Sequence, residues 1–264
     1  MNSISSLGFR SDLMLLALQG SDIEQRDGYL VVRTPTNPTF HWGNFLLLGD
    51  APEPGSVRRW IAAFRREFPG ADHLALGVDG ISGDAGQADE LAAERLEAEC
   101  STVLSASAIR PPTTPNREAE FRMLDADTDA DWDAALALQE ANFPSRYDDG
   151  EFARRRLSGH RELQARGHGG WFGAFLGDRL VSGLGIFGDD SGLARYQNVD
   201  THPDFRNRGL AGTLVHFAGQ YAFEQLRARR LVIVADPDYT AITLYRALGF
   251  DGTETQVQLS RASE

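Results

Sequence analysis

The segment 109–119, with the sequence IRPPTTPNREA, constrains the fold more than any other part of the chain. Its three prolines remove backbone N–H donors and fix φ, so neither a helix nor a β-ladder can run through it. We therefore predict a linker at 109–119 between an N-terminal domain over 1–108 and a C-terminal domain over 120–264. Both halves fall within the usual size range of a domain.

The C-terminal half alternates between apolar runs and segments with helical spacing. Gly177–Asp178 separates two apolar runs and predicts an antiparallel hairpin, whereas LVIVA at 231–235 is typical of a buried parallel strand. Together these patterns predict an α/β fold with a mixed sheet. The expected strands are 121–124, 171–176, 180–187, 193–201, 231–235 and 254–259, and the expected helices are 132–143, 151–165, a long helix from Gly209, and 239–248.

The N-terminal half repeats part of this order. Its expected elements are strand 45–48, helix 56–68, strand 74–78, helix 89–100 and strand 102–105. The shared order suggests a divergent internal repeat. Cys100 ends the predicted helix 89–100, and a lone cysteine there is expected to be a packed, small apolar residue.

Composition excludes several classes of function. A formal net charge of −12 argues against a nucleic-acid-binding protein, and no apolar run is long enough for a membrane helix. A single cysteine and no convincing signal peptide predict a cytoplasmic protein. The chain contains no lysine, which excludes a P-loop and Schiff-base chemistry.

Five aspartates alternate along 125–133, but they do not match a calcium-binding loop. An EF-hand loop needs glycine at its sixth position, whereas counting from Asp129 places Ala134 there, inside the predicted helix. Acidic residues that cap the helix N-terminus are the better interpretation.

The most informative bend is PDFRNRGLAGT at 203–213. It lies between a predicted strand and a predicted helix, whose first turn carries unpaired N–H groups and the positive end of the helix dipole. Small residues let an anion approach that backbone, and Arg206 and Arg208 add positive charge. The bend therefore indicates a pyrophosphate site, although an ordinary turn with surface arginines remains an alternative.

A dinucleotide site is a second alternative for the same bend. Gly209 and Gly212 match the last two glycines of G-x-G-x-x-G, and Asp236 follows at a suitable distance. However, Asn207 stands where the first glycine belongs, and too little chain follows Asp236 for a Rossmann sheet.

A second stretch, DPDYTAITLYRALGF at 236–250, favours a different family. With the bend, it resembles the GNAT superfamily of acyl-CoA-dependent N-acetyltransferases. The family's Q/R-x-x-G-x-G/A motif is matched by Arg206, Gly209 and Ala211. Its later motif is matched by Ala241, Leu244, Tyr245, Gly249 and Phe250, with Asp238 in place of the usual Asn. The resemblance covers about 120–260.

This resemblance implies roles for specific residues. Strand residues Val199, Asp200 and Thr201 would pair with the pantetheine arm of acetyl-CoA, and Tyr245 would protonate the departing thiolate. Asp238 would also belong to the cofactor site. The pyrophosphate would be held by the backbone of the following turn, consisting of Arg206, Asn207, Arg208, Gly209, Leu210, Ala211, Gly212 and Thr213.

The residue that deprotonates the acceptor amine is not fixed by the resemblance. Some relatives have a glutamate on the strand before the tyrosine helix, but Ile233 occupies the nearest position here. Asp200, His202 and Glu140 are candidate bases, directly or through water. The histidines show no metal-ligand spacing, so no metal is expected.

These observations predict two tandem GNAT-like domains, of which the C-terminal one is catalytic. The expected reaction is direct transfer of acetyl from acetyl-CoA to a primary amine of a small molecule or peptide. For Asp148 and Asp149, in the segment 143–150, solvated loop acids are the better interpretation, and attraction of the cationic amine is the alternative. In the N-terminal half, GDAPEPG at 49–55 places Asp50, Glu53 and two prolines at the corresponding bend, which disfavours a phosphate. The alternative is a non-catalytic acyl-CoA sensor. Neither nucleic acid nor a membrane is an expected partner, and no sequence feature predicts the oligomeric state.

Overall fold

A computed structural model of the chain describes residues 4–142, 151–238 and 241–261. The chain forms two compact units, and the linear division at 109–119 does not coincide with them. One unit comprises Met1–Leu104, Val234–Tyr239 and Gly252–Glu264, and the other comprises Ser105–Ile233 and Thr240–Asp251. The last segment of the chain, expected in the C-terminal domain, therefore clusters with the first unit.

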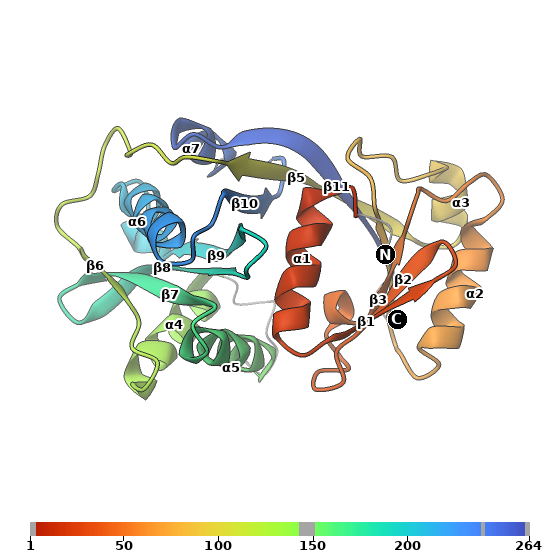
Figure 1. Cartoon of the computed structure of the whole chain (residues 1–264), viewed down its shortest axis with the longest axis horizontal. Helices are drawn as coiled ribbons and strands as arrows, with labels where there is room; N and C mark the ends of the chain where they lie inside the picture. Colours follow the sequence, from red (N-terminus) through yellow and green to blue (C-terminus); the bar gives the residue numbers. More distant parts are fainter. Residues whose placement is uncertain (1–3, 143–150, 239–240, 262–264) are drawn as a thin grey trace. The chain divides into compact units, whose positions relative to one another are not determined.

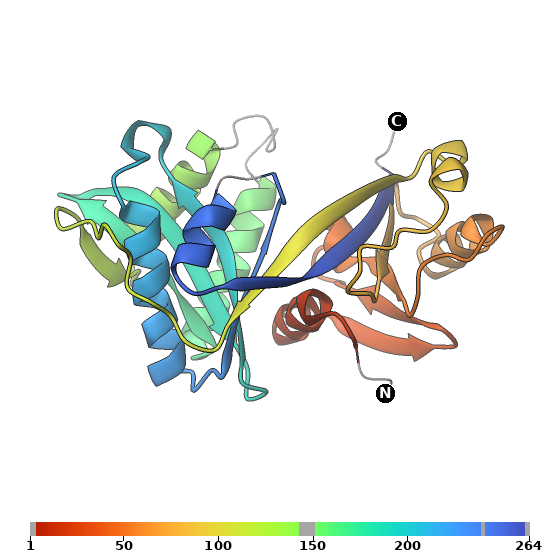
Figure 2. The same cartoon turned by 90° about the horizontal axis from the view of Figure 1, so that it is seen from above.

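The first unit is built on a mixed sheet with the strand order β1-β2-β3-β4-β11-β5. β3 and β4 are parallel, while β1–β2, β2–β3 and β4–β11 are antiparallel. β5 and β11 lie side by side as the two longest strands of this unit (Figure 2). Its elements are α1 (Leu7–Leu18), β1 (Asp22–Arg26), β2 (Tyr29–Arg33), η1 (His41–Gly43), β3 (Phe45–Leu48), α2 (Val57–Glu67), β4 (Leu74–Val78), α3 (Ala88–Ala93), β5 (Glu97–Ala106) and β11 (Asp251–Arg261).

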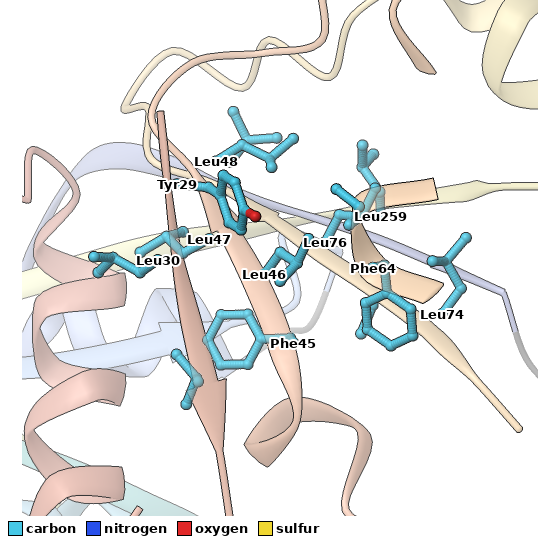
Figure 3. Packing of buried hydrophobic residues seen from close by; sticks show 14 of the residues in the cluster. Tyr29, Leu30, Phe45, Leu46, Leu47, Leu48, Phe64, Leu74, Leu76 and Leu259 are labelled. Atoms are coloured by element: carbon cyan, nitrogen blue, oxygen red, sulfur yellow. The ribbon is translucent and has the colours of Figure 1, made fainter. Parts of the chain in front are cut away.

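A leucine-rich core holds this unit together. Leu46, Leu76 and Leu259 come from three neighbouring strands and are fully buried, with Phe64 of α2 packed against them (Figure 3). Burial of a leucine side chain contributes about 1.5–3 kcal/mol. The C-terminal strand β11 is thus part of the first unit's core.

Two predictions for the first unit were wrong. The helix expected over 89–100 ends at Ala93, and β5 begins at Glu97. The chain leaves α3 through Arg95 at φ +54°, and the N–H of Leu96 donates to the carbonyl of Leu91, which is a left-handed helix stop. Cys100 therefore lies on β5 and is exposed rather than packed.

The second unit has the strand order β10-β9-β8-β7-β6. α4 and α5 cover one face of its sheet, and α6 covers the other (Figure 1). The predicted hairpin of β7 and β8 is confirmed, and β10, predicted as a buried parallel strand, pairs in parallel with β9. The elements are β6 (Glu120–Met123), α4 (Asp129–Asn142), α5 (Glu151–Ala165), β7 (Gly169–Leu176), β8 (Arg179–Gly188), β9 (Leu193–Thr201), η2 (Pro203–Phe205), α6 (Leu210–Glu224), β10 (Arg230–Ala235) and α7 (Ala241–Ala247).

Asp131, in the first turn of α4, binds residues outside the helix, a role that differs from the capping predicted for the aspartate run. Asp131 accepts two hydrogen bonds from Arg122 of β6, at 2.6 and 2.8 Å, and a third from the backbone N–H of Asp125. Asp125 in turn accepts a hydrogen bond from the hydroxyl of Thr128. These contacts bind the first turn of α4 to the edge strand of the sheet.

Candidate functional site

Strands β9 and β10 pair over only part of their length. They are in parallel register from Leu193 to Arg195, opposite Arg230 to Val232. β9 then continues to Thr201 along β8, beyond the last residue that pairs with β10. The end of β9 therefore presents a strand edge that has no strand partner among the described residues. An extended ligand that contains amide groups can bind to such an edge.

A β-bulge changes the direction of side chains near the end of β9. Gln197 pairs with Gly185 and Asp200 pairs with Gly183, so three steps along β9 match two steps along β8. Asn198 in this bulge has φ +46°. Because side chains alternate along a strand, the extra residue places Asp200 on the same face as Gln197, the face covered by α4 and α5.

The predicted bend between β9 and α6 is confirmed as a strand-to-helix turn. It passes through the short helix η2 and through two residues in the left-handed region, Asn207 at φ +61° and Gly209 at φ +72°. Gly209 is the N-cap residue of α6. The first N–H groups of this helix have no partner one turn earlier, so the turn has the geometry of an anion site.

The small residues of the bend have a second role that the sequence did not indicate. A Cβ on Gly209 would lie 2.5 Å from the carbonyl oxygen of Thr114, in the segment expected to be a linker. A Cβ on Gly212 would lie 3.0 Å from a methyl group of Leu244 on α7. Glycine at these two positions therefore permits close packing, in addition to the positive φ at Gly209.

The segment 109–119 is bound to the start of α6. The backbone N–H of Asn116 donates to Oγ1 of Thr213 at 2.8 Å, and its side-chain amide donates to the carbonyl of Arg208 at 2.9 Å. Oγ1 of Thr213 itself donates to the carbonyl of Gly209. Leu210 and Ala211 complete the first turn, with Leu210 buried in a small apolar cluster.

The two arginines of the bend are exposed, and both contact other parts of the second unit. Arg206 donates to Oδ1 of Asn142 at 2.7 Å and to the carbonyl of Thr201 at 3.3 Å. Arg208 forms an ion pair with Glu118 at 2.6 Å. Because such exposed contacts contribute little energy, they are compatible with transfer of either guanidinium to an anionic ligand.

Tyr245 lies on α7 and is largely buried, with 4% of its surface exposed. Its ring packs against Phe250, which also packs against Tyr196 of β9. Burial, together with the nearby hydroxyl of Tyr245, raises the pKa of Tyr196, whose hydroxyl donates to the carbonyl of Val215. Tyr245 thus belongs to an aromatic cluster on the α6 side of β9.

Asp238 and the acidic segment 143–150 are the two remaining predicted parts of the site. Asp238 lies in the segment Val234–Tyr239, which clusters with the first unit, and its N–H donates to Oδ1 of Asp236. The acidic segment 143–150 lies outside the described residues.

The three candidate bases have different surroundings. Nε2 of His202 lies 3.0 Å from the guanidinium of Arg179, which can only donate, so the nitrogen lone pair is already engaged. Glu140 is exposed on α4. Asp200 is 7% exposed, and its Oδ2 has no hydrogen-bond partner among the described residues. Burial raises the pKa of Asp200 to about 7, although Arg206 and Arg156 oppose this shift.

At the corresponding bend of the first unit, acidic groups occupy the helix N-terminus. The N–H of Gly55 donates to Oε1 of Glu90 at 2.7 Å, just before α2 begins. Pro52 packs closely against Gly86. This bend carries acidic side chains where the bend before α6 carries arginines, and one of its backbone N–H groups already donates to a carboxylate.

No group of three or more potential metal ligands was found among residues 4–142, 151–238 and 241–261. In the same part of the chain, no helix is long and apolar enough to cross a membrane.

Comparison with known proteins agrees with this geometry. Residues 132–250 match the model of the acetyltransferase (GNAT) family. This segment is a GNAT domain. It includes the bend, the end of β9 and Tyr245, and the family is one of acyl transfer with acetyl-CoA as co-substrate. A comparison with curated protein sequences found no match.

Solved structures extend the fold similarity to the whole chain. A protein of unknown function from Staphylococcus epidermidis superposes with a TM-score of 0.75 at 12% identity, covering 99% of this chain and 100% of its own. A GCN5-related N-acetyltransferase from Kribbella flavida gives 0.68 at 16% identity, covering 98% and 96%. A tandem GNAT protein of the clavulanic acid biosynthesis pathway gives 0.53 at 16% identity, covering 100% and 96%. The chain thus has the tandem GNAT fold, as the sequence predicted.

Sequence reasoning missed several residues around the site. Asn142 binds Arg206, Asn116 binds the start of α6, and Arg156 lies near Asp200. None of the three lies in a recognised motif. The proline-rich composition that marks 109–119 as a linker gives no signal that this segment also binds the helix.

Proposed function

We propose that the chain is an acetyl-CoA-dependent N-acetyltransferase that transfers acetyl directly to a primary amine of a small molecule or peptide. The observation that carries this proposal is the early end of β9–β10 pairing next to a left-handed turn that starts α6. This arrangement offers a strand edge and a helix N-terminus within a single unit.

In this proposal, separate parts of the second unit bind the cofactor and transfer the proton. The backbone of Val199–Thr201 would pair with the amides of the pantetheine arm, and the turn 206–213 would bind the pyrophosphate. Acetyl-CoA supplies the activated thioester. The hydroxyl of Tyr245 would give its proton to the sulfur that leaves, as a general acid.

The first unit, with acidic groups at its corresponding bend, would be a partner domain that does not bind acetyl-CoA. In this proposal the two GNAT-like repeats remain residues 1–108 and residues 120–264. The compact units differ from these repeats because two segments of the second repeat, Val234–Tyr239 and Gly252–Glu264, cluster with the first unit. The carboxylate of Glu90 on the N–H of Gly55 supports this assignment, because it occupies a donor that a phosphate would need.

Thermal unfolding with ligands tests the proposal. Acetyl-CoA at one hundred times its Kd should stabilise the protein by about 2.7 kcal/mol, whereas NAD should leave the Tm unchanged. Arg206→Ala should weaken acetyl-CoA binding about tenfold, roughly 1.4 kcal/mol. Arg154→Ala on the exposed side of α5 is the matched control and should bind like wild type. Stabilisation by NAD alone would contradict the proposal.

Release of free thiol from acetyl-CoA across a panel of primary amines then tests catalysis. Tyr245→Phe should lower kcat by about one hundredfold, because the general acid is lost while the ring remains in the aromatic cluster. Equal turnover by this variant would show that Tyr245 has no such role. Tight acetyl-CoA binding with no turnover by wild type would instead support the acyl-CoA sensor.

A further inference from the structure

The carboxylate of Asp200 is buried in the second unit, and one of its oxygens has no hydrogen-bond partner within the described parts of the chain. The residue is 7% exposed, and Oδ2 has no hydrogen-bond partner among the residues that the structure describes. An unpaired buried carboxylate oxygen is costly, so its presence requires an explanation. A structural ion pair would provide one, but none of the ion pairs among the described residues involves Asp200.

The position of Asp200 follows from the β-bulge at Asn198. Without the extra residue, Asp200 would lie on the α6 face together with Tyr196. With it, Asp200 pairs with Gly183 and lies on the face covered by α4 and α5. The two residues beside it, Val199 and Thr201, belong to the strand edge that has no partner from β10.

A second unpartnered polar atom lies close to the same point. Nε1 of Trp171, on β7, is buried and has no hydrogen-bond partner among the described residues. It would lie 3.5 Å from a Cβ placed on Gly183. Gly183 is therefore flanked by a buried donor from Trp171 and by Asp200, whose buried oxygen is an acceptor. Such a pair suits a polar group of a ligand.

The charged groups around Asp200 come from different elements. Arg156 on α5 and Arg206 in the bend both favour the ionised carboxylate, whereas burial opposes it. Gln197, on the same face of β9, is held by Arg156 at 3.3 Å. From α4, Leu138 contributes an apolar contact near Gly183 and Asn142 binds Arg206.

We infer that Asp200 is the general base of the proposed acetyl transfer and that the acceptor amine binds on the α4/α5 face of β9. This inference rests on the proposed function. The ammonium group of the acceptor gives one proton to Oδ2 of Asp200. The neutral nitrogen then forms the C–N bond to the acyl carbon as the C–S bond breaks, and the sulfur takes the proton of Tyr245.

Asp200 and Tyr245 together account for both protons that the acceptor nitrogen loses. The nitrogen loses a second proton as the amide forms, and this proton restores the hydroxyl of Tyr245. Asp200 releases its own proton to water, so each turnover yields the amide, the free thiol and one proton. A carboxyl whose pKa lies near 7 can accept and release this proton at neutral pH.

The decisive variant is Asp200→Asn, which keeps the shape of the side chain. It should fold at least as stably as wild type above pH 7. Because the folded-state pKa is raised, the ionised carboxylate destabilises the native protein at high pH, and the variant removes this charge. Asp133→Asn is the matched control, since it makes the same change at an exposed carboxylate of α4.

The expected result has a characteristic pH dependence. With the amine that wild type acetylates fastest in the panel, Asp200→Asn should lose about one hundredfold in kcat/KM at pH 7, and the loss should shrink steadily towards pH 10. At high pH the amine is already neutral and needs no base. A loss that is equal at every pH would show a structural role and overturn the inference, as would full activity at pH 7. The Kd for acetyl-CoA should stay within threefold of wild type.

A second measurement does not depend on finding an acceptor. NMR titration of protein labelled with ¹³C at the aspartate carboxyl groups should show a resonance with a midpoint between about pH 6 and 8 that is missing in Asp200→Asn. A midpoint below about pH 5 would overturn the inference. Failure of wild type to bind acetyl-CoA would instead contradict the proposed function, so the two failures are distinguishable.

Discussion

At the scale of single residues, His160 shows how burial controls charge in the second unit. It is 4% exposed and is stacked on Phe187, with Trp171 beside it. Burial lowers the pKa of His160 to about 3, and the nearby charge of Arg156 acts in the same direction. The imidazole is therefore neutral in the native state throughout the physiological pH range.

This burial predicts acid sensitivity of the second unit. An unfolded histidine gains a proton below about pH 6.5, whereas folded His160 does not, so stability is lost as the pH falls from about 6.5 towards 3. At pH 5 the loss relative to pH 7.5 should be about 2 kcal/mol. Urea unfolding at both pH values measures this difference, which should shrink in His160→Gln and persist in His168→Gln. An unchanged difference in His160→Gln would contradict this prediction.

At the scale of elements, the carboxylate of Asp131 links the first turn of α4 to the edge strand β6. Asp131 accepts hydrogen bonds from Arg122 and from the N–H of Asp125, and the Arg122 guanidinium holds the pKa of Asp131 below its usual value. The Arg122 side chain also lies over the ring of Phe175 at 4.0 Å.

Asp131→Asn should destabilise the second unit by about 1–3 kcal/mol at pH 7, because the variant loses charge-assisted hydrogen bonds to a mostly buried group. The contribution of Asp131 is present above the pKa of the unfolded carboxyl and is lost as the pH falls through the lower pKa of the folded one. The gap between the variant and wild type should therefore narrow in acid. Asp133→Asn, an exposed change two residues later, should have no effect on the urea midpoint.

The elements that could be predicted from sequence are those with strong local patterns. The hairpin at Gly177–Asp178, the strand 193–201 and the strand-to-helix bend all have a turn or a change of period that is visible in the sequence. The predicted helix 89–100 was wrong because Ala and Glu residues continue past the left-handed stop at Arg95 into β5. α1, β1 and β2 were not predicted.

The site was partly predictable for a related reason. Arg206 and the glycines of the bend form a local motif, so their position next to α6 followed from the sequence. The face on which Asp200 lies depends on a bulge, and the bulge depends on register with β8, which no single segment encodes. The contact of Asn116 with Thr213 likewise joins segments that are far apart in sequence.

At the scale of the whole molecule, the two compact units are not two consecutive stretches of chain. β11 lies between β4 and β5 in the strand order of the first unit, and Leu259 pairs with Leu76. A chain that ends at Asp251 should therefore fail to form this unit's sheet. Hydrogen exchange should show loss of protection in β3 and β4, and a peptide covering 251–261 added in trans should restore it. Full protection of β4 in the shortened chain would contradict this prediction.

The place of β11 also sets an order of events during synthesis. A ribosome that has released residues 1–104 has made most of the first unit, yet the strand that must enter between β4 and β5 is still untranslated. Until it arrives, the apolar edge of β4 is exposed to other chains and to chaperones. The part of the protein that is made first therefore cannot complete its sheet until residues 252–261 have been made.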